Sequence, residues 1–191
     1  SDEFTSPFMG LNFTVGSRRS GGTLTYVAVK IGNCARLYQN TDGYNGKSLT
    51  TSDSVPPVGA VSFWAYIGGL GGGVGFVGPN TNVWLKKLAA SVRVDVKSPN
   101  LFSWSDDTYE VTGDSWHHIY AIWDEASLVV YIDGTQRFDT TVGSGPTYSG
   151  FELHAQGNGS TYGDARIDSF KYWTSNIDFS AQEWNSGTGR E

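Results

Sequence analysis

The stretch from Asp114 to Asp139 constrains the fold of this chain more than any other. Residues 116–123 read WHHIYAIW, and residues 128–132 read LVVYI. Runs of aromatic and β-branched residues bounded by Asp, Glu, Ser and Gly are typical of β-strands. A short acidic turn separates the two runs, and Asp133-Gly134 predicts a second turn. Because the first run leaves no regular gap for solvent, we expect this hairpin to be covered on both faces. It is therefore predicted to form the central pair of a sandwich.

The composition favours an all-β domain with many turns. The chain has 191 residues, of which 25 are glycine, 17% are charged and 14% are aromatic. Few charges with many glycines and aromatics indicate short strands and little helix. We expect a single domain over residues 1–191 with a sizeable core. The opening Ser1-Asp2-Glu3-Phe4 is typical of a cloning remnant, so part of residues 1–6 is expected to have that origin.

Alternation of apolar and polar residues predicts seven further strands, and together with the hairpin they indicate a two-sheet antiparallel β-sandwich or jelly roll. The seven are expected at residues 23–30, 35–38, 61–67, 82–88, 90–96, 151–156 and 165–173. In the third, Phe63, Ala65 and Ile67 fall on one face. The seven glycines from Gly68 to Gly78 predict a flexible hairpin loop. Residues 40–54 are expected to form a turn-rich connection, and residues 179–184 a single helical turn.

Charge and cysteine content exclude some functions. The net charge is −6 and the pI about 5.0. Only Arg18-Arg19 and Lys86-Lys87 place basic residues together, so nucleic acid is not expected as a partner. No stretch has the length of a membrane span or the pattern of a signal peptide, so membrane insertion is not expected either. The one cysteine, Cys34, forms no intrachain disulfide and is expected to be a small buried residue. The oligomeric state stays open.

Three segments of this chain resemble motifs of the laminin-G-like, concanavalin-A-like jelly-roll family, laminin G domain 3 type. Residues 61–69, VSFWAYIGG, are similar to its strand ISFWVK, and residues 115–136, SWHHIYAIWDEASLVVYIDGTQ, to its hairpin WHHVAVTYDG…LYVDG. Residues 165–184, ARIDSFKYWTSNIDFSAQEW, are similar to its closing IDDVRIYNRALSAEEI. The order and spacing of the three motifs agree with the family. The resemblance implies the fold but not one activity, because this family includes carbohydrate-binding modules, adhesion domains, phage tail components, glycosidases and polysaccharide lyases.

We expect a non-catalytic carbohydrate-binding or adhesion module of a larger extracellular, cell-surface or viral protein. Sugars bind to aromatic rings beside polar hydrogen-bonding groups, and alternation puts such residues on the outward side of three strands. The residues expected to face outward together and bind a glycan are Trp64, Tyr66, Arg93, Asp95, Glu152, His154 and Gln156. For Trp64, packing beneath a loop is an equally good interpretation. Further contacts at the rim are expected from Trp104 and Tyr109, with Tyr44, Trp84 and Tyr162 as alternatives.

Two enzymatic activities are alternatives to binding alone. The six glutamates do not form the E-x-D-x-E pattern of jelly-roll glucanases, which disfavours retaining hydrolysis of that kind. A polysaccharide lyase needs a cation to neutralise a uronate and residues for proton transfer. Arg93, His154 and Tyr66 are the candidates for those roles, although His154-x-Gln156 reverses the Q-x-H order of the alginate lyases that it resembles. A structural or protein-binding domain is the third alternative.

The sequence contains several candidate metal sites. His117 and His118 are adjacent on a strand and therefore point to opposite faces, so they are expected to be structural. The family resemblance implies a structural Ca²⁺, held by Asp168 in the closing motif and by carbonyls near Gly32. Ser169 stands where the family often has a second Asp. The rival cation sites are the loops at 42–45 and 106–107, and Asp168 capping a bulge is the alternative without metal.

Overall fold

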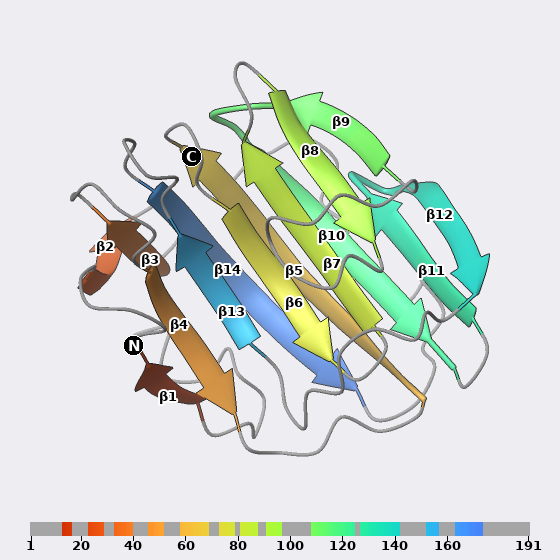
Figure 1. Ribbon diagram of the computed structural model, residues 1–191, viewed down its shortest axis with the longest axis horizontal. Coiled ribbons are helices and arrows are strands. Elements are labelled where there is room, and N and C mark those ends of the chain that lie inside the picture. Colours follow the sequence, from red (N-terminus) through yellow and green to blue (C-terminus); the bar gives the residue numbers. More distant parts are fainter. Residues whose placement is uncertain are drawn as a thin grey trace.

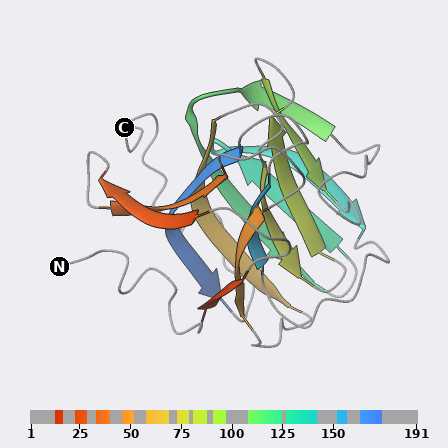
Figure 2. The ribbon, with the colours of Figure 1, turned by 60° about the vertical axis from the view of Figure 1, so that its left-hand side comes forward.

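The computed structural model is a β-sandwich of two layers (Figures 1 and 2). It describes the backbone of residues 13–16, 23–28, 33–39, 46–51, 58–68, 73–78, 81–87, 91–96, 108–124, 127–141, 152–156 and 163–173. Side chains are described for residues 58–68, 109–124, 127–140, 164, 166–168, 171 and 173. Within this part of the chain no helix has the length and hydropathy that a membrane crossing requires.

Among the described residues, each layer is a sheet of seven strands, and all neighbouring strands are antiparallel. Sheet A has the order β1 (Phe13–Gly16), β4 (Gly46–Thr51), β13 (Glu152–Gln156), β6 (Gly73–Gly78), β7 (Thr81–Lys87), β8 (Ser91–Val96) and β9 (Thr108–Thr112). Sheet B has the order β12 (Thr135–Thr141), β11 (Ser127–Ile132), β10 (Trp116–Trp123), β5 (Gly59–Gly68), β14 (Gly163–Trp173), β3 (Asn33–Gln39) and β2 (Thr23–Ala28). This arrangement confirms the predicted all-β, two-sheet antiparallel jelly roll.

The hairpin that dominates the sequence forms β10, β11 and β12. Seven of the eight residues of β10 are buried, so this strand is covered on both faces as expected. Asp133 and Gly134 have φ of 50° and 76° and join Ile132 to its partner Thr135 in a tight two-residue turn. The hairpin is not the centre of its sheet, however. Because β12 extends the sheet beyond β11, β5 becomes the middle strand, with β10 and β14 on either side.

The core lies against the inner face of sheet B. The prediction for β5 is confirmed, because Phe63, Ala65 and Ile67 share this face and are at most 2% exposed. Their buried neighbours on the adjoining strands are Ile119, Ala121, Leu128, Val130, Ile132 and Ile167. Full burial of a Leu, Ile or Phe side chain contributes about 1.5–3 kcal/mol to stability. This face supplies a large part of the hydrophobic stabilisation among the described residues.

Three strands lie where the sequence predicted loops or turns. The glycine-rich segment contains β6, and the connection at 40–54 contains β4. The polar segment before the hairpin, for which the sequence predicts a loop with Trp104 and Tyr109, contains β9. In β6, Val74 and Phe76 alternate with glycines, and glycine gives no polarity signal, so the period of two was hidden. Pairing with neighbouring strands on both sides then outweighs the low strand propensity of glycine. The predicted helical turn at 179–184 lies outside the described residues.

Candidate functional site

The outer face of sheet A can be identified from its pairing register and from the exposed residues of β9. Arg93 on β8 lies opposite Lys86 on β7 and opposite Glu110 on β9. Glu110 and Thr112 are exposed, whereas Tyr109 and Val111 are half-buried. Because successive residues of a strand alternate between faces, Glu110 and the positions paired with it belong to the outer face.

Five of the predicted ligand residues occupy positions on this one outer face. The pairing of residues can be followed from β8 through β7 and β6 to β13. It assigns five positions to the outer face: Arg93, Asp95, Glu152, His154 and Gln156. Trp84 lies opposite Asp95 and shares the face. The sequence had suggested Trp84 only as an alternative contact at the rim. The outer face of sheet A therefore combines an aromatic residue with cationic, anionic and amide residues.

Trp64 and Tyr66 do not share that face, which corrects the predicted grouping. Both lie on β5, the central strand of sheet B. Trp64 is 8% exposed, which leaves little of its ring for a sugar. Tyr66 is half-buried, with its ring 4.4 Å from the Arg166 guanidinium and 5.7 Å from the Trp116 ring. Alternation along a strand assigned each residue a face of its own sheet, but it could not say which sheet the strand joins.

The same division separates the three residues of the lyase alternative. Tyr66 lies in sheet B, whereas the positions of Arg93 and His154 lie in sheet A. Within sheet A, β8 and β13 are three strands apart, which is roughly 14 Å at the usual strand spacing. The described fold does not bring the three together as the sequence prediction required.

The rim residues have separate positions. Tyr109 lies at the inner positions of β9, and its ring carries the Arg137 guanidinium at 4.3 Å. Arg137 is the extra residue of a bulge, because Val130 pairs with Phe138 while Tyr131 pairs with Gln136. Tyr109 therefore contacts the edge strand of the other sheet. The remaining rim candidates, Trp104, Tyr44 and Tyr162, lie outside the described residues.

The outer face of sheet B carries a row of three buried residues from adjacent strands. Trp64 pairs with Asp168 on β14 and with His118 on β10, and their exposed fractions are 8%, 2% and 2%. The Trp64 and His118 rings lie 5.2 Å apart, and Ser62 Oγ is 2.8 Å from His118 Nε2. Burial lowers the pKa of His118 to about 4, and Lys171 acts in the same direction, while Asp133 opposes both. His118 is therefore neutral near pH 7.

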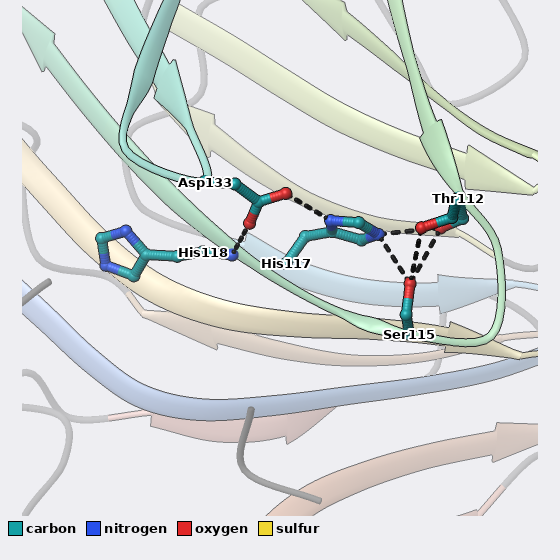
Figure 3. A network of polar contacts seen from close by, with 5 residues as sticks. All are labelled: Thr112, Ser115, His117, His118 and Asp133. Atoms are coloured by element: carbon teal, nitrogen blue, oxygen red, sulfur yellow. Dashed lines mark hydrogen bonds and ion pairs between the residues drawn. The ribbon is translucent and has the colours of Figure 1, made fainter. Parts of the chain in front are cut away.

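His117, on the opposite side of β10, lies in a polar network that the sequence did not predict (Figure 3). Its Nδ1 donates to Asp133 Oδ2 at 2.7 Å, and its Nε2 donates to the Thr112 carbonyl at 2.8 Å. Asp133 Oδ1 also accepts from the His118 backbone N–H at 2.9 Å. Burial lowers the pKa of His117, but the hydrogen bonds to Asp133 and Thr112 outweigh burial and raise it above 6.5. These contacts tie the β9–β10 connection to the β11–β12 turn.

The network contains Ser115, His117 and Asp133, the residue types of a catalytic triad, and Ser115 Oγ is 3.0 Å from His117 Nε2. A triad needs a neutral imidazole whose Nε2 accepts the serine proton. Here the carboxylate and the carbonyl both accept, so both ring nitrogens carry protons, and Ser115 Oγ itself donates to the Thr112 carbonyl at 3.2 Å. The arrangement locks the hairpin and does not activate the serine. The prediction that the two histidines have separate partners on opposite faces is confirmed.

The calcium prediction involves one described residue. Asp168 is a buried carboxylate on β14, and continuing the pairing of β14 with β3 places it opposite the start of β3, near Gly32 in sequence. An oxygen ligand of the kind that Ca²⁺ prefers is therefore present. Gly32 and both rival loops lie outside the described residues. Among the described residues, no three His, Cys, Asp or Glu gather at one point.

Comparison with known proteins identifies the fold. The model of a family of the laminin G 3 type, described as the concanavalin A-like lectin/glucanases superfamily, matches residues 42–183. No curated protein matches the sequence. Three solved structures illustrate the range of proteins with a similar fold. At 18% identity or less, their similarity shows the fold alone.

The first is the binding domain of botulinum neurotoxin DC in complex with SialylT, with a TM-score of 0.58 and 15% identity over 88% of this chain and 44% of that chain. The chain thus spans less than half of the toxin domain. Domain 4 of AbnA, an extracellular arabinanase from Geobacillus stearothermophilus, in complex with arabinotriose, has a TM-score of 0.50 and 18% identity over 88% and 84% of the two chains. An endo-β-1,4-glucuronan lyase from the fungus Trichoderma reesei has a TM-score of 0.55 and 12% identity over 87% and 92%.

Proposed function

Since this chain belongs to the concanavalin A-like lectin/glucanase superfamily, we propose that it is a non-catalytic carbohydrate-binding module. The larger protein that it serves is, in this proposal, extracellular, at a cell surface or part of a virion. The observation that carries the proposal is the outer face of sheet A. There, Trp84 and five of the predicted ligand residues occupy positions of one face on β7, β8 and β13.

The chemistry of this face suits a sugar. Sugars combine apolar C–H surfaces with many hydroxyl groups, so they are held by an aromatic ring together with hydrogen-bonding side chains. The outer positions supply Trp84 as the aromatic residue, with Asp95, Glu152 and Gln156 as acceptors and an amide donor. Two proteins of similar fold bind sugars according to their names: the toxin domain in complex with SialylT and the arabinanase domain in complex with arabinotriose.

A glycan array tests this function. We expect the wild-type domain to bind at least one class of glycan and Trp84→Ala to lose that binding while keeping its melting temperature. Trp173→Ala is the matched control, because Trp173 is a half-buried tryptophan on sheet B. An array without signal would overturn the proposal. So would turnover, followed as absorbance of an unsaturated product from uronate polysaccharides, because the module would then be a lyase.

We also propose that Asp168 ligates a structural Ca²⁺ that fastens the early part of the chain to β14. Its buried carboxylate supports this, because it supplies oxygen ligands of the kind that Ca²⁺ prefers and lies opposite the start of β3 when the β14–β3 register is extended. A ligand that binds only the folded state raises the melting temperature. We expect Ca²⁺ to raise the midpoint, a chelator to lower it and Asp168→Asn to remove the difference. Equal midpoints with and without the chelator would remove the ion from the proposal.

A further inference from the structure

The middle strand of sheet A has two glycines at consecutive outer positions. β6 lies between β13 and β7 in sheet A (Figure 1). Gly75 pairs with Trp84 and Gly73 pairs with Lys86, so both glycines belong to the outer face. Glycine in a strand interior weakens the strand and often marks a place where a ligand approaches the backbone closely. A glycine inside a strand also lowers stability relative to alanine, because it loses more conformational freedom on folding. The outer side of β6 is therefore poorly suited to stability alone.

The strands on either side of the glycines carry large polar and aromatic residues. On β7 these are Trp84 and Lys86. On β13, Glu152 pairs with Val77 and Leu153 with Phe76. Extending this register along β13 brings the position of His154 level with Gly75 and that of Gln156 level with Gly73. Strands lie roughly 4.8 Å apart, so the backbones of β13 and β7 are roughly 10 Å apart, with only backbone between them at the glycines. We call this strip, bounded by Trp84, Lys86, His154 and Gln156, the β6 slot.

The charges around the slot are arranged in order along β6. At the Val77 end, the neighbouring position on β13 is Glu152, an acid. At the Gly73 end, Lys86 on β7 lies opposite Arg93 on β8, so two cations adjoin. Glu110 lies beyond Arg93, on the side away from the slot. The slot thus has an anionic end and a cationic end. Trp84, which pairs with Gly75, lies between the two ends.

We propose that the β6 slot binds one carboxylate-bearing sugar unit, a uronate, within a longer glycan. The sugar lies over Gly73 and Gly75, Trp84 supplies the aromatic surface, and Lys86 with Arg93 supplies the positive charge for the carboxylate. The repulsive acid at the other end fixes the direction of the unit. This inference rests on the proposed glycan-binding function and adds to it the position and the chemical class of the ligand.

Isothermal titration with tetragalacturonate and with its methyl ester tests the inference, because the ester keeps the ring and removes the charge. We expect the wild-type domain to prefer the acid at least tenfold. Gly75→Leu fills the slot and is expected to lower the affinity at least tenfold. Ser48→Leu is its matched control, because Ser48 pairs with His154 on the next strand and lies on the same face outside the slot. Its affinity should remain within twofold of wild type, and melting curves confirm that each variant is folded.

Lys86→Gln separates the charge from the shape and does not depend on the leucine variant folding. We expect it to lower affinity for the acid about tenfold, to leave the ester unchanged and to weaken the salt dependence of binding. Equal wild-type affinity for acid and ester overturns the uronate assignment. A folded Gly75→Leu that binds like wild type overturns the slot. In both cases glycan binding on the array stands, whereas a wild-type domain that binds no glycan overturns the proposed function as well.

Discussion

The outer faces of the two sheets carry similar types of residue but differ in how far their described residues are exposed to solvent. On sheet B the row Asp168, Trp64 and His118 is at most 8% exposed, although it faces away from the sandwich core. On sheet A the outer positions of β9 are open to solvent at Glu110 and Thr112. On sheet B an aromatic ring beside an acid and a histidine is therefore part of the folded interior, whereas the described outer residues of β9 on sheet A contact solvent. Residue type alone does not distinguish a binding surface from a buried layer.

Replacing the buried tryptophan should give the largest effect. We expect Trp64→Ala to lower the free energy of unfolding by about 3–5 kcal/mol, because it removes a large side chain that is 8% exposed. Glu110→Ala, on the open face, should change it by less than about 0.5 kcal/mol. Urea unfolding of both variants measures the difference. Comparable losses at the two positions would remove the contrast between the faces.

Acid should destabilise the sheet B face through His118. Burial lowers its pKa from 6.5 to about 4, so the unfolded chain takes up a proton at a higher pH than the folded chain. The contribution of neutral His118 to the free energy of unfolding is therefore complete above pH 6.5. As the pH falls towards 4, the free energy of unfolding decreases by about 3 kcal/mol. Unfolding free energies of wild type and His118→Asn between pH 7 and pH 4 check this. The two profiles should diverge over that range, and parallel profiles would contradict it.

His117, one residue away, should have the opposite pH dependence. Its pKa is raised above 6.5, since the hydrogen bonds to Asp133 and Thr112 outweigh burial. The stability that it contributes is present below pH 6.5 and is lost as the pH rises through the folded pKa. We expect the melting temperature to decline as the pH rises above 6.5 in wild type but not in His117→Asn. An NMR titration of both imidazoles should give the order His117 above His118, and the reverse order would refute both assignments.

The smallest effect is expected where the edges of the two sheets meet. The Arg137 guanidinium lies 4.3 Å from the Tyr109 ring, and Arg137 is exposed. A cation–π contact at such a site contributes about 0.5–1 kcal/mol, so Arg137→Ala should lower stability by that amount. Tyr109→Phe keeps a ring beneath the cation, so this variant should retain most of the stabilisation from the cation–π contact. Equal losses in both variants would assign the contribution to the hydroxyl group.

Much of the fold could be predicted from the sequence because its strands have clear periodicity. The alternation of β5 and the turn at Asp133-Gly134 agree with the structure, and the family matched over residues 42–183 is the one that the motifs resemble. β6 was missed because Gly73 and Gly75 at its outer positions carry no signal of polarity. The candidate site was predicted in part. Arg93, Asp95 and the three residues of β13 share a face, whereas Trp64 and Tyr66 do not.

The sequence by itself determined the strands that have a clear local period of two, and which face each of their residues takes. It also determined that His117 and His118 could not share a ligand. Only the tertiary structure decided which strands join which sheet, and so removed Trp64 and Tyr66 from the face of Arg93. Pairing between distant segments also decided which outer face is buried. Strand partners and burial depend on contacts between residues far apart in the chain, which no local pattern records.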